Sequence, residues 1–316
     1  MPFVTPSSPP RPVPAALCGA LLLAACGDDG GSGDMNPPQE SVSDGVDDLK
    51  ANIEVAVKAG PGVFGLGPSA GVVDGWTVSF DRLLVTVGTV SFTDQNGFVT
   101  AHQEDAVLDL LQLASPSALA SITFTPGSQK VRFSVPDATD RFVAFESTAA
   151  ADRDLMAANG WSLLVEGRID NPAGMTCTAD KVPLCTPAPS VAFRWGLAAG
   201  TAFSGCPDVV VDPGDELAAT IELSADRLFY PGFADDDASA PTLRAQWLAD
   251  ADLDRDGETT LDELGSIKAS ALFPRSLGYD FLGAPIGVAT ARDFVEAQAR
   301  SLGRRALGLC PTSTRL

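Results

Sequence analysis

Histidine is nearly absent from the sequence, and positive charge is scarce. His102 is the single histidine among 316 residues. Zinc, copper and non-haem iron sites usually need several imidazoles, so one chain has too few for a histidine-built metal centre. Lysine and arginine number 21 against 41 aspartates and glutamates, which gives a formal net charge of −20. This balance argues against nucleic acid and anionic lipid surfaces as partners, because both need clustered cations.

No apolar run in the sequence is long enough to span a bilayer as a helix. The apolar stretch 13–25 is too short to span but suits an export signal, with Arg11 as the only positive charge before it. It ends in LLAAC (22–26), which resembles the bacterial lipobox. This resemblance implies a signal peptide at 1–25, a lipidated Cys26, and a location in the bacterial cell envelope, facing the periplasm or the cell surface. The alternative is an ordinary secretory signal cleaved nearby.

Residues 26–48 are rich in Gly, Pro, Asp and Ser and have little to bury, so we expect a flexible tether. Four cysteines follow it, at Cys177, Cys185, Cys206 and Cys310. An exported chain enters an oxidising compartment, where disulfides are the default. Four cysteines allow three pairings, of which we favour Cys177–Cys185, closing a small loop, with Cys206–Cys310.

Residues 49–230 carry a pattern of short strands. NIEVAVKAG (52–60), WTVSF (76–80) and SVAFRWGL (190–197) alternate apolar and polar residues and are separated by Gly, Pro, Asp and Asn. This pattern predicts an antiparallel β-sandwich domain, whereas a parallel sheet would need regular strand–helix alternation. The run AVLDLLQLA (106–114) fits either a strand or a short helix.

Residues 231–316 change to a helical pattern. Apolar residues fall on one face in 241–251, 261–272 and 290–302, and Thr290 with Asp293 fits the start of the last helix. The sequence therefore predicts a mainly β protein with a small helical C-terminal segment.

Between the first two of these helices lies DLDRDGETTLDEL (252–264), with six carboxylates in thirteen residues. A twelve-residue calcium loop takes ligands from positions 1, 3, 5, 7, 9 and 12 and needs Gly at position 6. Counting from Asp252 places Gly257 at position 6, and the expected ligands are Asp252, Asp254, Asp256, Glu258, Thr260 and Glu263. The loop resembles an EF-hand, and the cofactor that it predicts is Ca²⁺.

The hand is expected to be solitary. Position 8 is Thr259, where an aliphatic residue usually pairs with a partner hand, and ADDDASA (234–240) lacks the Gly and Glu of a second loop. Extracellular calcium modules bind near ~10⁻⁴–10⁻³ M, which suits a constitutively bound ion. We therefore expect the ion to brace two helices rather than to act as a sensor, although a regulatory role stays open.

Two short motifs that occur in enzymes carry little weight. GPGVFG (60–65) matches a dinucleotide-binding pattern, but a Gly- and Pro-rich stretch follows it instead of a helix. GPSAG (67–71) places Ser69 in a nucleophile-elbow pattern, but His102 lies early in a β-rich region rather than late in the chain. We assign no catalytic residue and expect the chain not to be an enzyme.

The wider pattern resembles a group of uncharacterised bacterial lipoproteins with a β-sandwich body and a C-terminal EF-hand calcium loop. The residues that suggest this are AVLDLLQL (106–113), RLFYPGF (227–233), 248–264 and the closing LGLC (307–310). In such relatives a histidine often precedes the LFY stretch, whereas this chain has Arg227 there. The resemblance implies a location and a calcium site, not an activity or a second metal site.

We therefore expect a lipid-anchored, extracytoplasmic, calcium-binding protein with a non-enzymatic binding or envelope-structural role. Its partner would be a protein or a carbohydrate, and a sugar would need exposed aromatic rings from among Trp76, Trp161, Trp195 and Trp247. One alternative is an accessory protein to an envelope redox or metal enzyme. A further alternative is a hydrolase, which would need a pocket with converging carboxylates.

Overall fold

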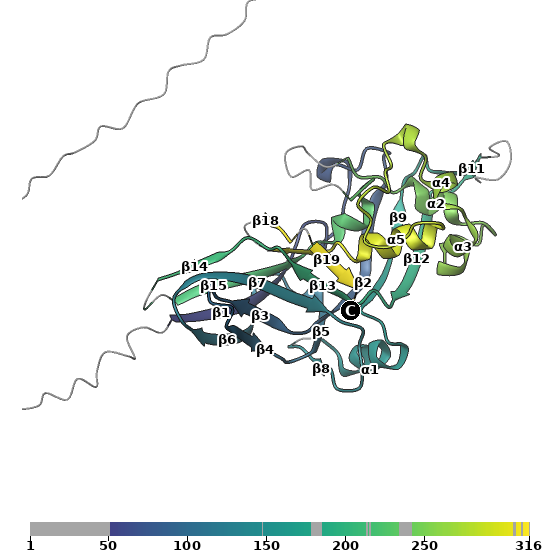
Figure 1. The fold of residues 1–316 in the computed structure, drawn as a ribbon. Coiled ribbons are helices and arrows are strands. Elements are labelled where there is room, and N and C mark those ends of the chain that lie inside the picture. The colour runs from purple at the N-terminus through teal and green to yellow at the C-terminus, as the bar shows by residue number, and fades with distance from the viewer. Residues whose placement is uncertain are drawn as a thin grey trace, which may run out of the picture. The chain divides into compact units, whose positions relative to one another are not determined.

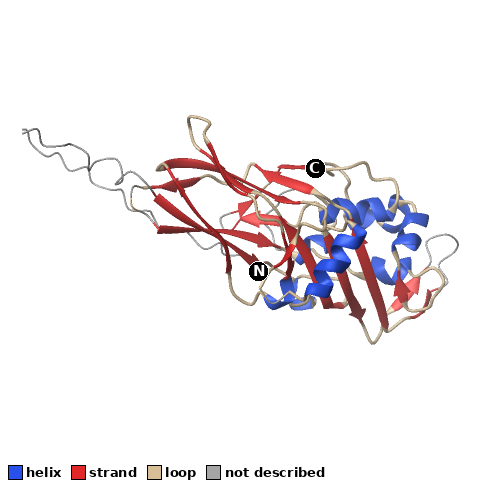
Figure 2. Cartoon of the chain, turned by 90° about the horizontal axis from the view of Figure 1, so that it is seen from below, coloured by secondary structure: helices blue, strands red, loops and turns tan. Residues whose placement is uncertain are grey.

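The computed structural model describes residues 51–316, apart from Ser147, 178–184, Pro213, Asp215, 234–241, 306–307, Pro311 and Leu316. The expected signal peptide, Cys26 and the tether lie outside the described residues, as does the acidic stretch 234–240. Strands outnumber helices in the part that is described (Figure 1, Figure 2). The prediction of a mainly β fold is confirmed.

The first sheet consists of β1 (Ala51–Ala59), β6 (Ser117–Phe124), β15 (Glu216–Leu223), β17 (Gly303–Arg305) and β18 (Gly308–Leu309). Its order is β18-β17-β15-β1-β6. β1 buries Ile53, Val55 and Val57 as its alternation predicts. It pairs antiparallel with β6 but parallel with β15, so the strand that begins the described chain lies inside the sheet.

The second sheet consists of β3 (Val90–Thr93), β4 (Val99–His102), β7 (Gly127–Val135), β13 (Thr201–Ser204), β14 (Val209–Val211) and β19 (Thr312–Arg315). Its order is β19-β13-β7-β3-β4, and β14 also pairs with β7. All of these pairs are antiparallel. β7 buries Val131, Phe133 and Val135 on one face.

The third sheet consists of β2 (Thr77–Val87), β5 (Ala106–Asp109), β8 (Val143–Ala144), β9 (Leu163–Asp170), β12 (Ser190–Leu197) and β16 (Glu258–Thr259). Its order is β16-β12-β9-β2-β5-β8. The central pairs are antiparallel, whereas the outer pairs β12–β16 and β5–β8 are parallel. The expectation of antiparallel pairing therefore holds for most pairs but not for these two or for β1–β15, because local sequence pattern does not fix which distant strands meet.

The helices are α1 (Ala150–Asn159), α2 (Gln246–Ala251), α3 (Leu261–Ser266), α4 (Ala269–Leu272) and α5 (Ala291–Ala299). Three-residue or five-residue 3-10 turns lie at η2 (Pro68–Ala70), η3 (Leu110–Gln112), η4 (Ala225–Phe229) and η5 (Arg275–Leu277). The apolar run 106–114 divides between β5 and η3, so each of its two interpretations is correct for part of it. α1 was not predicted, because it buries a single side chain, Met156, and so carries little apolar periodicity.

The C-terminal helices are shorter than their sequence patterns suggest. The predicted helix 241–251 is helical from Gln246, and the predicted helix 261–272 is interrupted between α3 and α4. The start of α5 is as predicted, since Thr290 is its N-cap and forms a capping box with Asp293.

Helices α2 to α5 lie beside β9 and β12 (Figure 1). Aromatic rings connect them to the sheet: the centroids of Trp195 and Trp247 are 5.6 Å apart, and those of Trp247 and Phe273 are 5.5 Å apart. Phe273 in turn lies 4.2 Å from Phe294 of α5. Most buried apolar side chains of these helices and of the three sheets belong to one cluster, and a smaller cluster lies between the third sheet and α1. Strands and C-terminal helices thus share one core.

The prediction of disulfide bonds is confirmed. Cys177 is bonded to Cys185 and Cys206 to Cys310, which are the pairs that the sequence favoured. The first bond links β10 (Met175–Cys177) to β11 (Cys185–Pro187), which form a separate two-stranded sheet. Disulfides persist in oxidising compartments, so the bonds indicate a location outside the cytoplasm. Among the helices that the structure describes, none has the length and apolar character needed to cross a bilayer.

Candidate metal centre

The acidic loop 252–260 connects α2 to α3, so the predicted helix–loop–helix order is present. Asp252 is the C-cap of α2, and Thr260 is the N-cap of α3. Both helices have six residues. Helices this short are not stable alone in water, so their positions depend on packing and on the contacts of the loop between them.

Three of the predicted ligands converge. One carboxylate oxygen from each of Asp252, Asp254 and Asp256 lies within 4.8 Å of the other two. Asp252 is 2% exposed, while Asp254 and Asp256 are exposed. The Oδ1 atom of Asp252 is buried and has no hydrogen-bond donor among the described residues. A buried carboxylate oxygen without a donor is costly unless a cation or a water lies beside it.

Burial also raises the pKa of Asp252 above its ordinary value of 3.8, and the negative charges of Glu263 and Asp256 add to the shift. Hydrogen bonds from the backbone N–H groups of Gly257, which donates to Asp252 Oδ2 at 3.1 Å, and of Arg255 oppose this rise in pKa. The ionised form of Asp252 is thus disfavoured by its surroundings. A divalent cation among the three carboxylates would reverse this, because it replaces lost hydration and cancels the repulsion.

The backbone of the loop turns sharply, as the motif requires. Gly257 has φ 88° and Arg255 has φ 62°, both in the left-handed region. The carboxylates hold the turn: Asp254 Oδ1 accepts from the Asp256 N–H at 3.2 Å, and Asp256 Oδ1 accepts from the Glu258 N–H at 2.9 Å. These bonds arrange the backbone so that the side chains at 252, 254 and 256 point toward a shared volume.

Glu263 does not join the cluster of three. Its Oε1 atom accepts from the Leu253 N–H at 2.7 Å, and its Oε2 atom accepts from the Thr260 N–H at 2.8 Å and the Thr260 hydroxyl at 2.9 Å. Glu263 and Thr260 therefore form a capping box at the start of α3. Glu258 has an exposed side chain, but position 7 of a calcium loop supplies its backbone carbonyl and not its side chain. The structure thus brings together three of the six predicted ligands and places the Glu263 carboxylate in contact with both ends of the same loop.

The loop is also attached to the third sheet, which the sequence did not reveal. Its residues Glu258 and Thr259 form β16 and pair with Ala192 and Phe193 of β12. The Gly257 carbonyl accepts from the Ala192 N–H at 2.8 Å. Thr259 is fully buried, and its hydroxyl donates to the Leu248 carbonyl of α2 at 2.6 Å. The sequence contains one sign of this attachment, because position 8 is the polar Thr259, where paired EF-hands usually have an aliphatic residue.

The β10–β11 hairpin contacts the same helix from another side. Asp250 Oδ1 accepts from the Cys177 N–H at 2.8 Å and from Gln246 Nε2 at 2.9 Å. Burial raises the pKa of Asp250 to about 6, against these two hydrogen bonds. α2 thus ends between a disulfide-bonded hairpin and the acidic loop.

The residues that the sequence offered for sugar binding and for catalysis have less structural support than the acidic loop. Trp76, Trp195 and Trp247 are buried and Trp161 is partly buried, so these four side chains do not form an exposed platform for a sugar ring. His102 is a partly exposed side chain 3.7 Å from Glu104. Ser69 lies in the 3-10 turn η2 rather than at a sharp strand–helix turn.

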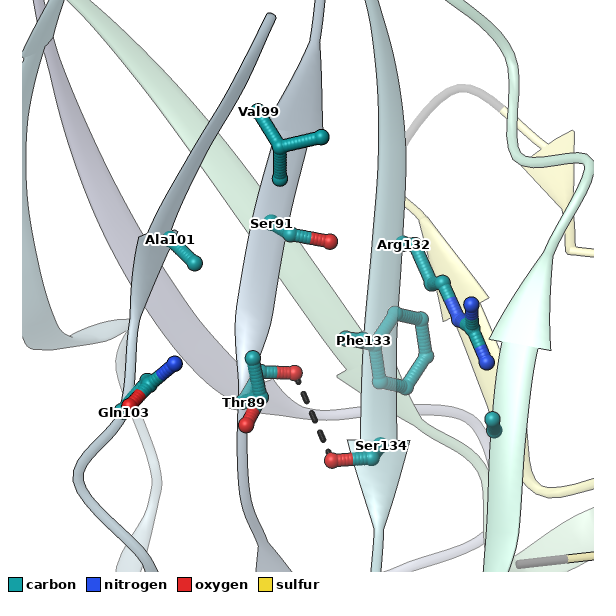
Figure 3. Close-up of a pocket in the computed structure, with 9 residues that line it drawn as sticks. Thr89, Ser91, Val99, Ala101, Gln103, Arg132, Phe133 and Ser134 are labelled. Carbon is teal, nitrogen blue, oxygen red and sulfur yellow. Dashed lines mark hydrogen bonds between the residues drawn. The ribbon is translucent and has the colours of Figure 1, made fainter.

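A shallow pocket of about 360 Å³ lies on the outer face of β3, β4 and β7 (Figure 3). Its lining includes Thr89, Ser91, Ala101, Arg132 and Ser134, and Ser134 donates to the Thr89 carbonyl at 3.4 Å. None of its lining residues is a carboxylate. A second pocket of similar volume has Asp280 as its single acid. Neither pocket has the pair of carboxylates that a glycoside hydrolase needs.

Comparison with known proteins gives little further guidance. No family model matches the chain, and no curated protein matches it. Among solved structures, MbnP from Methylosinus trichosporium aligns with a TM-score of 0.30 and 14% sequence identity, over 57% of this chain and 76% of that chain. A likeness at this level supports no inference about the chain.

Proposed function

We propose that this protein binds one calcium ion in the loop from Asp252 to Glu263, and that the ion braces the C-terminal helices against the β body. We further propose that the body is a β-sandwich and the loop a solitary EF-hand. The protein would be lipid-anchored at Cys26, outside the cytoplasm, with a non-enzymatic binding or envelope-structural role.

The observation that carries the calcium proposal is the environment of Asp252. Its Oδ1 atom is buried and accepts no hydrogen bond from the part of the chain that the structure describes, and its carboxylate belongs to a group of three that each place one oxygen within 4.8 Å of the others. A cation beside this oxygen would remove the cost of burying it without a donor. The convergence of the three carboxylates supports the proposal that the cation lies among them.

The chemistry of the donors favours calcium over zinc and copper. Asp252, Asp254 and Asp256 offer oxygen only, and Glu258, Thr260 and Glu263 follow in the spacing that adds further oxygens. Ca²⁺ takes six to eight oxygen ligands in flexible geometry, whereas zinc and copper sites prefer imidazole and thiolate. When bound, the ion would neutralise the repulsion among the three aspartates.

The contacts of the loop support a bracing role. The loop contacts α2 through the hydrogen bond from Thr259 to Leu248, and β12 through the hydrogen bond from Ala192 to Gly257. It contacts α3 through Glu263, which accepts from the Leu253 N–H at the start of the loop. An ion that fixes the loop therefore fixes three elements at once. Because the loop already pairs with a strand of the body, no partner hand is needed for it to be ordered.

The experiment is calcium titration by calorimetry on the exported protein, with Glu263→Gln as the test variant. We expect one calcium per chain, with a dissociation constant near ~10⁻⁴–10⁻³ M, and clearly weaker binding in the variant. Asp262→Asn is the matched control, since Asp262 is an exposed neighbouring acid outside the ligand positions. Absence of calcium binding by the unaltered protein would refute the proposal.

The lipid anchor has its own test. Growth of an expressing bacterium with labelled palmitate should label the unaltered protein, and Cys26→Ala should remove the label and release the protein from membranes. Labelling that survives Cys26→Ala would contradict the assignment of this residue.

A further inference from the structure

We propose, as an extension that rests on the proposed calcium site, that calcium binding and the Cys177–Cys185 disulfide are energetically coupled through helix α2. The disulfide strengthens calcium binding, and bound calcium protects the disulfide from reduction. The acidic loop and the β10–β11 hairpin then become fully ordered together, and only where calcium is abundant and the two cysteines are oxidised.

The hairpin contacts α2 through each of the three residues of β10. Gln246 Nε2 donates to the Met175 carbonyl at 2.7 Å, and the Cys177 N–H donates to Asp250 Oδ1 at 2.8 Å. Between them, the buried Thr176 donates its hydroxyl to the Ala249 carbonyl. Cys177 itself carries the disulfide, so the bond fixes the strand that makes these contacts.

The acidic loop contacts the same helix one residue away. The Thr259 hydroxyl donates to the Leu248 carbonyl at 2.6 Å, and Asp252 follows the last residue of α2 directly. The last carbonyls of a helix have no partner within it and need outside donors. In α2 the adjacent carbonyls of Leu248 and Ala249 receive theirs from the acidic loop and the hairpin, respectively.

This shared dependence is the physical basis of the coupling. A six-residue helix has too few internal hydrogen bonds to be stable alone. If the hairpin loosens, the Ala249 carbonyl loses its donor and the end of α2 that places Asp252 is held less firmly. The calcium-competent population falls, and the apparent affinity falls by the same fraction. Linkage makes the effect reciprocal, so bound calcium must also favour the hairpin-ordered state.

The chain offers a matched control in its second disulfide. Cys206 and Cys310 are buried, and within the described residues no hydrogen bond joins either of them to α2. Removal of that bond tests whether calcium affinity responds to any loss of a disulfide or specifically to loss of the hairpin. Thr176→Val provides a second test variant that keeps both disulfides, and Thr186→Val, on the paired residue of β11, is its control.

The experiment is a calcium titration of the unaltered protein, the double variants Cys177→Ala/Cys185→Ala and Cys206→Ala/Cys310→Ala, and the two threonine variants. Circular dichroism first establishes which of them are folded. We expect the dissociation constant to rise about five-fold or more without the hairpin disulfide and to rise in Thr176→Val. It should be unchanged in Thr186→Val and in the variant lacking Cys206–Cys310. If the hairpin variant does not fold, the Thr176→Val and Thr186→Val pair decides.

An unchanged dissociation constant in both the hairpin variant and Thr176→Val overturns the coupling while leaving the calcium site intact. Failure of the unaltered protein to bind calcium overturns the proposed function instead, so the two failures are distinguishable. As the reciprocal readout, dithiothreitol should reduce Cys177–Cys185 more slowly in calcium than in chelator, measured by alkylation and mass spectrometry. Equal rates of reduction would count against the coupling.

Discussion

The indole N–H of Trp195 donates a hydrogen bond to the backbone carbonyl of Thr259, with 3.1 Å between nitrogen and oxygen. Trp195 belongs to β12 in the β body, and Thr259 lies in the acidic loop. Both residues are fully buried, and the Trp195 ring stacks on Trp247 of α2. One residue of the sheet therefore contacts both the loop and the helix before it.

Trp195→Phe should destabilise the protein, because the Thr259 carbonyl would lose its donor in a buried position. Such a loss costs about 1–3 kcal/mol. Urea unfolding should therefore give a lower free energy of unfolding than in the unaltered protein. Trp161→Phe, a change of the same size at a partly buried site, is the control and should cost less; the reverse order would contradict this role of Trp195.

Gly257→Ala and Gly265→Ala should have opposite effects. Gly257 has φ 88° with no atom near the position of an added Cβ, so its substitution is strained by conformation alone, by about 1–2 kcal/mol. Gly265 lies in α3 with its nearest such atom 3.9 Å away, so alanine there should stabilise by about 0.5–1 kcal/mol. Thermal melts in chelator measure the melting temperatures of both variants. If both substitutions shift the melting temperature in the same direction, the backbone conformation described for the loop is wrong.

The start of α5 gives a prediction on pH. Burial alone would raise the pKa of Asp293, but hydrogen bonds from Thr290 and the Ala289 N–H outweigh it, so the pKa is lowered from 3.8. A lowered carboxylate pKa stabilises the fold above pH 3.8, and this contribution is lost as pH falls through the lower folded value. Asp293→Asn should thus cost about 0.3–1 kcal/mol at pH 7 and progressively less below pH 3.8. A difference that is independent of pH would exclude this charge effect.

The two disulfides should contribute unequally to stability. Cys206–Cys310 spans a sequence separation of 104, and Cys177–Cys185 spans 8. Chain entropy gives roughly 4.7 kcal/mol for the long loop and roughly 2.5 kcal/mol for the short one. Denaturant unfolding of the two double alanine variants should therefore show the larger loss in free energy of unfolding when Cys206–Cys310 is removed. The disulfide that we propose to be coupled to calcium, Cys177–Cys185, closes the shorter loop and should contribute less.

Features set by local pattern could be predicted from the sequence, and features set by long-range pairing could not. The alternation in β1, the capping box of Thr290 and the Cys177–Cys185 pair are local. Cys206–Cys310 is a long-range pair, but it is the pairing that remains once Cys177 and Cys185 are joined. The spacing of Asp252, Asp254 and Asp256 likewise brought three carboxylates together. By contrast, the pairing of β16 with β12 joins residues more than sixty positions apart, and no periodicity encodes it.

Glu263 shows a different limit of sequence reasoning. The ligand spacing predicts that it faces the ion, whereas in the structure its carboxylate caps α3 and contacts Leu253. The same residue suits both arrangements, because a glutamate three positions after Thr260 is also the residue that a capping box requires. Spacing alone does not decide between them.

The most direct test of the account is the melting temperature of Asp252→Asn and of the unaltered protein, each measured in calcium and in chelator. Calcium at ten to a hundred times its dissociation constant should stabilise the unaltered protein by about 1.4–2.7 kcal/mol. Asp252→Asn removes the buried charge, so the variant should melt at the same or a higher temperature in chelator but gain little from calcium. If the unaltered protein melts at the same temperature in calcium and in chelator, the ion does not brace this fold.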